Sequence, residues 1–536
     1  MRTTASLVFG LLGLVFPAYA DPTWPNDFDD FEEVMYQVFG FKARRFADMV
    51  YPCNNEPVPG RFNSAEWLRT GFHDMATANA FFGTGGLDAS LQYELDNDEN
   101  GGPAFNSTLT FMSQFFNRKT SLADLIALGV YTSVRSCQGP IVPIRYGRLD
   151  ATSRGPTGVP QVQNSVVTLR QQFERMGFNP TEMIQLIACG HTIGGVHSDP
   201  NFKIVPPGTL ENDVGPLDST PDVYDSHVVM DYLNGSTPDP LVTGPSVALG
   251  HHSDFRVFNS DGNATLRAMA RYIRIRTTEL PADSIKALTA GLGTGFDEAF
   301  AFFPINRTIP ASTGISSFTI SINMAGGDVI HHNNNRKSYP VQDAIIFQKR
   351  QSCLLQSSGT LILTVAVRND VTDHPISASI AHKKPQTNSP VPRLQKMTVE
   401  LEKGRDHGEY TLFSVDTTIP GGLSSESTID ITGGGYAEAF RRVDEIGQKC
   451  QPFEGSDKYS SVKPPASSII SKSATGSGPV TSITTSGTVM SGSGSGTVTP
   501  ASPSETATSE RDSGTVTSVS LIEPDTSDAS SQRLFV

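Results

Sequence analysis

The segment EWLRTGFHDM runs from Glu66 to Met75 and places four side chains of functional interest within six residues. They are Arg69, Phe72, His73 and Asp74. If the segment is a helix, Arg69 and His73 are four residues apart and share one face. A cation and an imidazole are poor neighbours unless both act on one group opposite them. Asp74 points from a different face, toward a glycine-rich acidic loop. The alternative is an ordinary solvated helix surface.

A second histidine weakens that alternative. His191 ends an apolar helical run in the segment ACGHTIGG. The small residues after it would let a flat group approach the backbone closely. Two separate helical segments therefore each present an imidazole, which favours a shared ligand over two unrelated surface residues.

Two helices that each present a histidine resemble the plant, fungal and bacterial haem peroxidase superfamily. The segment from residue 28 to residue 305 is most similar to the secreted fungal members. Five motifs occur in the order of that family: RTGFHD, GGLDAS, YGRLD, ACGHTIGG and LDSTPDVYD. The resemblance implies a mainly α, two-lobed fold that holds haem b between a distal and a proximal helix.

The same resemblance assigns roles to the matching residues. His191 would ligate the haem iron, and its other ring nitrogen would bond to the carboxylate of Asp261. On the opposite side of the haem, His73 would move the proton of the bound peroxide. Arg69 would stabilise the charge that develops there, and Phe72 would pack over the haem.

His73 must also present a neutral nitrogen to the peroxide. The family orients this histidine with an asparagine, which is supported by an acid six residues earlier. In YELDNDENGG those positions are Asn100 and Glu94. Asn97 is a competing candidate for the same role.

Two acidic loops beside the histidines resemble the calcium sites of the family. Carboxylate, hydroxyl and carbonyl oxygens on flexible loops suit Ca²⁺. The expected distal ligands are Asp74, Gly86, Asp88 and Ser90, and the expected proximal ligands are Thr192, Asp218, Thr220, the Val223 carbonyl and Asp225. For each loop, an ordinary turn is the alternative.

Some members of the family oxidise their electron donors at dedicated sites away from the haem edge. The residues that form those sites are incomplete in this chain. Manganese-oxidising relatives use three carboxylates, and the matching positions hold Phe62, Glu66 and His197. Leu186 replaces the surface tryptophan of lignin-oxidising relatives, and Leu217 replaces the radical tryptophan of cytochrome c-oxidising relatives. We therefore expect small phenols or other aromatics to donate electrons at the haem edge.

Composition limits the partners and the compartment. The 536-residue chain has a net charge of -14, which argues against nucleic acid as a partner. Residues 1–20 predict a signal peptide rather than a buried helix or a transmembrane segment. Sequons at Asn106, Asn234, Asn263 and Asn306 support a secreted glycoprotein.

Periodicity divides the mature chain into three parts. Residues 21–308 form the helical peroxidase domain, and residues 309–453 alternate as the strands of a small sandwich. Residues 454–536 are rich in Ser, Thr and Gly, and they predict a disordered tail that could associate with a cell wall.

Five cysteines in an oxidising compartment favour two disulfides and one remaining thiol. The resemblance implies a disulfide between Cys53 and Cys137. Cys353 and Cys450 are suitably placed to brace the β-rich domain. Cys189 lies within an apolar helical run, where we expect a buried thiol.

The leading hypothesis is a secreted, monomeric haem peroxidase that uses H2O2 and small aromatic donors, with two bound Ca²⁺ ions. The alternative is a cell-wall or adhesion protein that carries an inactive peroxidase-like domain. The presence of Arg69, His73, Asn100, His191 and Asp261 together argues against loss of activity.

Overall fold

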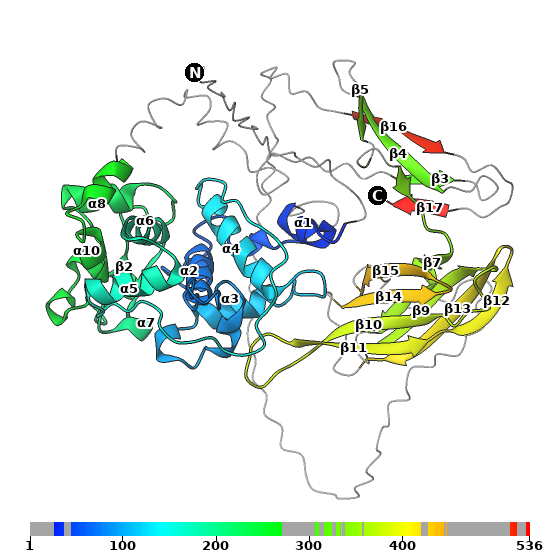
Figure 1. Ribbon diagram of the computed structural model, residues 1–536, viewed down its shortest axis with the longest axis horizontal. Coiled ribbons are helices and arrows are strands. Elements are labelled where there is room, and N and C mark those ends of the chain that lie inside the picture. Colours follow the sequence, from blue (N-terminus) through cyan, green and yellow to red (C-terminus); the bar gives the residue numbers. More distant parts are fainter. Residues whose placement is uncertain are drawn as a thin grey trace, which may run out of the picture.

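A computed structural model of the chain describes residues 26–36, 44–270 and most of 306–446, together with two strands at 515–522 and 532–535. The predicted signal peptide, residues 271–305 and Cys450 lie outside the described residues. Apart from a short two-stranded ribbon within the helical part, helices precede strands along the chain, as the periodicity predicts (Figure 1).

The helical domain contains ten described α-helices and a short ribbon of two strands. The helices are α1 (Asp29–Tyr36), α2 (Asn63–Met75), α3 (Ala104–Met112), α4 (Leu122–Ser136), α5 (Val166–Met176), α6 (Pro180–Gly190), α7 (Ser198–Asn201), α8 (His227–Asn234), α9 (Pro240–Thr243) and α10 (Ser253–Phe258). The ribbon pairs β1 (Gly195–His197) with β2 (Val214–Pro216), and the 3-10 turns η2 (Ser90–Tyr93) and η3 (Asp98–Asn100) follow α2.

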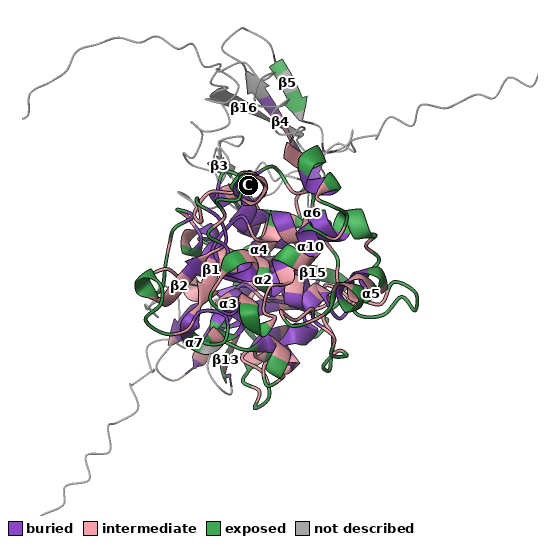
Figure 2. Cartoon of the chain, turned by 90° about the vertical axis from the view of Figure 1, so that its left-hand side faces the viewer, coloured by how far each residue is buried: buried purple, intermediate pink, exposed green. Residues whose placement is uncertain are grey.

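Two hydrophobic cores divide this domain into two lobes. One core joins α2, α3 and α4 around Trp67, Phe105 and Leu125. The other core joins α5, α6 and α10 around Phe173 and Ile184. Figure 2 shows the buried residues gathered inside the domain and the exposed residues on its outer faces.

Glycines set the close packing of α2 against its neighbours. A Cβ at Gly71 would collide with Val130 of α4, and a Cβ at Gly129 of α4 would collide with Met112. With one face of α2 fixed against α4, the face that carries Arg69 and His73 is left for other contacts.

The start of α6 follows from local sequence. Asn179 and Glu182 form a reciprocal capping box, and Pro180 occupies the first helical position. The helix ends at Gly190, so His191 stands at its C-terminal boundary. Cys189 is a free, exposed thiol, which makes the expectation of a buried thiol wrong. The buried face of α6 is the one that carries Ile184 and Ala188.

The β-rich domain is built from two antiparallel sheets that share one core. One sheet has the order β11 (Arg393–Glu400), β10 (Ser377–Lys384), β14 (Thr428–Gly433) and β15 (Tyr436–Arg442). The other has the order β12 (Glu402–His407), β13 (Tyr410–Thr418), β9 (Thr360–Arg368) and β7 (Ile345–Phe347), and β8 (Cys353–Leu355) also pairs with β9. Alternating apolar residues of β9, β10 and β14 fill the space between them.

A smaller group of strands corrects the expectation of a wholly unstructured tail. Strand β4 (Ser317–Asn323) pairs with β5 (Val329–His332), β6 (Tyr339–Pro340) and β16 (Thr515–Ile522). Strand β3 (Asn306–Ile309) pairs with β17 (Gln532–Phe535). The segment of β16, TVTSVSLI, is rich in β-branched residues, which suit a strand.

Buried charges join the helical domain to the β-rich domain. Arg442 of β15 donates to Glu33 of α1 at 2.8 Å, and Arg44 donates to Asp30 at 2.9 Å. Asn117 and Thr120 also donate to the carboxylate of Asp30. Burial alone would raise the pKa of Asp30, but Arg44 and these hydrogen bonds outweigh it and hold the pKa below its ordinary value.

We expect Asp30→Asn to lower the free energy of unfolding by about 3–5 kcal/mol at neutral pH, because the buried Arg44 would lose its nearest carboxylate. The folded pKa of Asp30 lies below its unfolded value. This stabilisation is therefore complete above about pH 4 and is lost as the pH falls through the folded pKa. Thermal denaturation across pH measures both effects.

Asp27→Asn is the control, because the side chain of Asp27 is 94% exposed. We expect no measurable change in stability from this control. Equal destabilisation by both variants would contradict the importance of the buried network.

Candidate active site

His73 is held by a short chain of hydrogen bonds on the distal side. Its Nδ1 lies 2.8 Å from Oδ1 of Asn100, and Nδ2 of Asn100 donates to the carbonyl of Glu94 at 3.0 Å. That second bond orients the amide so that its oxygen faces the imidazole. Nδ1 of His73 therefore carries the hydrogen, and Nε2 keeps its lone pair.

Asn100, and not its competitor Asn97, is thus the residue beside His73. The supporting group of Glu94 is its backbone carbonyl, while its carboxylate accepts a hydrogen bond from the amide of Gly155 at 2.7 Å. Burial, together with the charge of Arg69, lowers the pKa of His73 to about 3. The imidazole is neutral at physiological pH.

Phe105 of α3 is a distal residue that the sequence reasoning missed. The guanidinium of Arg69 lies 4.3 Å from the centre of its ring, and the ring of His73 lies 4.5 Å from it. Burial lowers the pKa of Arg69 to about 10, so the side chain stays charged at neutral pH. Phe72, next to His73, is half-buried and contacts Phe173 of the other lobe.

On the proximal side, the carboxylate beside His191 belongs to Asp254. Nδ1 of His191 lies 2.5 Å from Oδ2 of Asp254, a residue that is 1% exposed at the start of α10. Burial would lower the pKa of His191, but Asp254 outweighs burial and raises it. Ser253 donates to the other oxygen of Asp254 at 3.0 Å.

The expectation that Asp261 pairs with His191 is therefore wrong. Asp261 accepts hydrogen bonds from the amides of Ala264 and Thr265 and from the Thr265 hydroxyl. These bonds satisfy amides at the start of a helical turn. The composition of the segment NSDGN is typical of such a turn, whereas Asp254 precedes apolar residues at helical spacing.

A second buried acid lies behind Asp254. Asp239 is 1% exposed, and its Oδ1 accepts from the amide of Leu241 at 2.8 Å. Burial and the nearby charge of Asp254 raise the pKa of Asp239 well above its ordinary value. The raised pKa favours the neutral form of Asp239, which avoids a second negative charge beside the carboxylate that faces His191.

Three observations fit a flat, iron-binding group between α2 and α6. The side chain of His191 remains 29% exposed, although burial is the largest influence on its pKa. A Cβ placed on Gly190 would meet nothing within 4 Å, so space is open beside the imidazole. The charge of Arg69 acts to lower the pKa of both His73 and His191, so both imidazoles lie within reach of its electrostatic influence. A free imidazole nitrogen and adjoining open space suit haem.

The predicted distal calcium ligands come together after α2. The carboxylate of Asp74 accepts from the amides of Asp88, Ala89 and Leu91 at 2.9, 2.8 and 3.0 Å. Burial, with the charge of Asp88 nearby, raises the pKa of Asp74 to about 7. Oγ of Ser90 is buried without a hydrogen-bond partner. The carbonyl of Gly86 lies 3.5 Å from the Thr77 hydroxyl in the same loop.

The predicted proximal ligands also lie together. Thr192 Oγ1 lies 3.2 Å from Asp218 Oδ2, and Thr220 Oγ1 lies 3.1 Å from Asp225 Oδ2. Val223 belongs to the same turn, where its amide donates to the carbonyl of Thr220. Burial, with the charge of Asp225, raises the pKa of Asp218 to about 6. A cation bound at either loop would offset the free-energy cost of burying ionised carboxylates there.

Within the described part of the chain, no three His, Cys, Asp or Glu side chains gather as a metal site. Each loop has instead two carboxylates, with hydroxyl and carbonyl oxygens beside them. This donor set is compatible with Ca²⁺.

An arginine occupies the region where manganese-oxidising relatives gather carboxylates. Arg61 forms an ion pair with Glu66, whose other oxygen accepts from Ser107 at 3.1 Å. Nε2 of His197 lies 3.0 Å from the carbonyl of Gly60. The single carboxylate in this region is therefore already neutralised.

The predicted disulfide between Cys53 and Cys137 is confirmed. Cys353 is also disulfide-bonded, and its suspected partner Cys450 lies outside the described residues. Among the helices that the structure describes, none is long and apolar enough to cross a membrane.

Comparison with known proteins agrees with this geometry. A family model described as peroxidase matches residues 59–256, which include both histidines. An L-ascorbate peroxidase of Arabidopsis thaliana is 29% identical over 196 residues, and a versatile peroxidase of Pleurotus eryngii is 32% identical over 191 residues. This chain belongs to the plant, fungal and bacterial haem peroxidase superfamily.

A longer match is to a protein that is not named as a peroxidase. A WSC domain-containing protein of Arthroderma benhamiae is 33% identical over 531 residues, which cover 84% of this chain and 71% of that protein. The matches to the ascorbate and versatile peroxidases cover 36% and 33% of this chain, and 65% and 49% of those relatives. Each of these two matches therefore spans about a third of this chain.

We expect His191→Ala to prevent stable haem retention and Asp254→Asn to weaken haem affinity or activity by about 10–100-fold. Asp261→Asn is the matched control, because Asp261 caps a helical turn away from His191. The ratio of haem absorbance to protein absorbance measures retention. If Asp261→Asn lost haem and Asp254→Asn did not, Asp261 and not Asp254 would be the partner of His191.

Proposed function

We propose that this chain is a secreted haem peroxidase that reduces H2O2 and oxidises small phenols or other aromatics at the haem edge. The observation that carries the proposal is the pairing of two histidines with hydrogen-bond partners that set their roles, His73 with Asn100 and His191 with Asp254. When bound, haem supplies the redox chemistry, accepting two electrons from donors one at a time.

The distal residues are suited to moving one proton. Nε2 of His73 can take a proton from the peroxide, because Asn100 holds the hydrogen of the ring on Nδ1. The same nitrogen can return that proton to the leaving oxygen. Arg69 keeps a positive charge at neutral pH, and its guanidinium lies over the Phe105 ring beside His73, where it can stabilise developing negative charge.

The proximal residues are suited to holding the iron. His191 would be the ligand through Nε2, while Asp254 fixes the ring and makes it more basic. The raised pKa of Asp239 favours its neutral form, which avoids a second negative charge next to Asp254.

Two bound Ca²⁺ ions form part of the proposal. Asp74 directly follows His73, so an ion at Asp74, Gly86, Asp88 and Ser90 would fix the end of α2. Thr192 directly follows His191, so an ion in the proximal loop would fix the end of α6. The buried, unpartnered hydroxyl of Ser90 and the raised pKa values of Asp74 and Asp218 support both sites.

Secretion and a cell-wall association are inferred from several features. The Cys53–Cys137 disulfide suits an oxidising compartment. Asn106 and Asn234, two of the sequon residues, are exposed and accessible to glycosylation. Residues 454–536 would provide the wall contact, and we infer a monomer.

A second candidate is a cell-wall or adhesion protein with an inactive peroxidase-like domain. The long match to a WSC domain-containing protein favours it, because that relative is not named as a peroxidase. The two candidates differ in one observable property, which is reaction of a bound haem with peroxide.

We expect His73→Ala to retain haem and to slow the reaction with H2O2 by about 10²–10⁴-fold. Because His73 stays neutral until the pH falls to about 3, the wild-type rate should fall only in that acidic range. Stopped-flow absorbance measures the rate. A rate unchanged by His73→Ala would exclude this histidine as the base.

We expect efficient turnover of simple phenolic dyes and weak oxidation of Mn²⁺, because Arg61 neutralises the one carboxylate in that region. Non-phenolic aromatic alcohols should also be poor donors. Glu66→Ala should leave the steady-state rate with phenolic dyes unchanged. Saturable Mn²⁺ oxidation that disappears in Glu66→Ala would refute the assignment of donors.

A further inference from the structure

The β-rich domain contacts the distal side of the helical domain through one loop. This loop, residues 385–392, joins β10 to β11 and extends over the helical domain (Figure 1). Oγ of Ser389 donates to Oε1 of Gln92 at 3.0 Å. Val391 is 2% exposed and belongs to the same hydrophobic core as Leu91.

Gln92 lies in η2, a turn with direct bonds to the distal residues. The amides of Ala89 and Leu91 donate to the carboxylate of Asp74, the residue after His73. Nε2 of Gln92 donates to the carbonyl of Ala89 at 3.1 Å. The turn is therefore bonded to the end of α2 on one side and to the loop on the other.

The residue after η2 completes the connection to the catalytic imidazole. The carbonyl of Glu94 accepts the hydrogen bond that orients Asn100, and Asn100 holds His73. The six residues from Ala89 to Glu94 thus contact the loop, Asp74 and Asn100. A displacement of this turn would act on His73 from two directions.

The turn also contains backbone strain that outside contacts must hold. Ala89 has a φ of 61°, in the left-handed region that non-glycine residues seldom adopt, and it is fully buried. Such a conformation persists only where the surrounding structure enforces it. The contacts that enforce it include Asp74, Gln92 and the core that Val391 completes.

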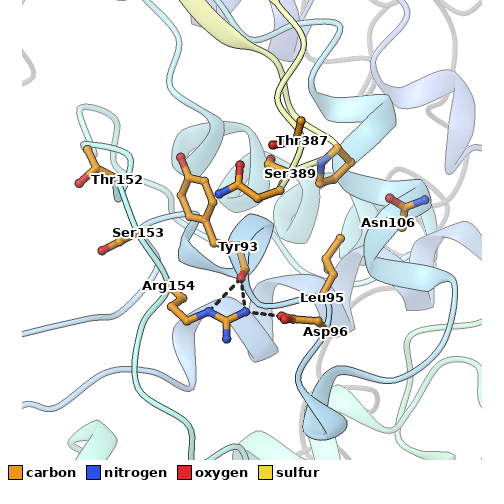
Figure 3. A pocket seen from close by; sticks show the side chains of 11 residues that line it. Tyr93, Leu95, Asp96, Asn106, Thr152, Ser153, Arg154, Thr387 and Ser389 are labelled. Carbon is orange, nitrogen blue, oxygen red and sulfur yellow. Dashed lines mark hydrogen bonds and ion pairs between the residues drawn. The ribbon is translucent and has the colours of Figure 1, made fainter.

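Beside these contacts the loop stands away from the helical domain. A pocket of about 680 Å³ separates them, with Tyr93, Asp96 and Arg154 on one side and Thr387 and Ser389 on the other (Figure 3). Arg154 donates to the carbonyl of Tyr93 at 2.8 Å and pairs with Asp96. Because this space is open, Ser389 and Val391 provide the local contact with η2.

We propose that the 385–392 loop is a positioning element for the distal site. It fixes η2, and through η2 it fixes the end of α2 and the Asn100–His73 pair. The catalytic consequence rests on the proposed peroxidase function, whereas the effect on η2 does not. This assigns to the β-rich domain a role in the chemistry of the helical domain.

The test compares Ser389→Ala and Val391→Ala with Lys383→Met in the full-length protein. Lys383 donates to the carbonyls of Ser113 and Gln114 at 2.7 and 3.0 Å, so its substitution weakens the domain contact without touching η2. Hydrogen exchange of the Ala89 and Leu91 amides measures the turn directly. Stopped flow with H2O2 and the haem spectrum measure the consequence at His73.

We expect Ser389→Ala and Val391→Ala to speed exchange of these two amides by about 5-fold or more, with unchanged exchange in α6. The reaction with H2O2 should slow by a similar factor while haem content stays constant. Lys383→Met should leave both measurements at wild-type values. Ser389→Ala removes only a hydroxyl, so it remains informative if Val391→Ala fails to fold.

Unchanged exchange in both loop variants, or the same change in Lys383→Met, would overturn the proposal. Faster exchange in the two loop variants, together with a wild-type protein that lacks peroxidase activity, would support the positioning role and reject the proposed function. An active wild type whose loop variants show wild-type exchange and rates would reject the positioning role alone.

Discussion

The hydrogen bond between His73 and Asn100 is the interaction on which the rest of the site depends. It puts the ring hydrogen on Nδ1, so that Nε2 is available as a base. A buried imidazole without that partner could adopt either tautomer. The bond requires Asn100 to be held in turn, and the carbonyl of Glu94 provides that contact. The orientation of His73 on α2 therefore depends on a turn that lies outside the helix.

On the proximal side, a buried carboxylate orients His191. His191 needs a negative partner to act as a strong ligand, yet an ionised carboxylate is costly in the interior. Asp254 receives hydrogen bonds from His191 and Ser253. Burial and the charge of Asp254 raise the pKa of Asp239, which favours its neutral form, because two adjacent buried carboxylates cannot both ionise cheaply. The arrangement concentrates one negative charge where the imidazole needs it.

Local patterns in the sequence predicted the parts of the site that depend on short spacing. The i and i+4 positions of Arg69 and His73 follow from helical spacing, whereas Asn100 was identified through the family resemblance. The alternation after residue 310 likewise predicted the two-sheet domain. These features depend on periodicity and turn chemistry, which a single sequence contains.

Contacts between distant segments were harder to predict. Asp254 and Asp261 are close in sequence, and only packing of α10 against α6 decides which one reaches His191. Phe105 and Asp239 contribute through burial, which has no local signature. The contact between Ser389 and Gln92 joins residues 297 positions apart, and no pattern in either segment indicates it. Only the tertiary structure identifies these residues.

The central claim is that the two histidines flank a reactive haem. An absorbance spectrum of the purified full-length protein, followed by titration with H2O2, tests it most directly. The account predicts the intense haem band of a histidine-ligated iron and a spectral change that is complete near one equivalent of peroxide. A protein reconstituted with haem that shows no such band, or a bound haem that ignores peroxide, would contradict it.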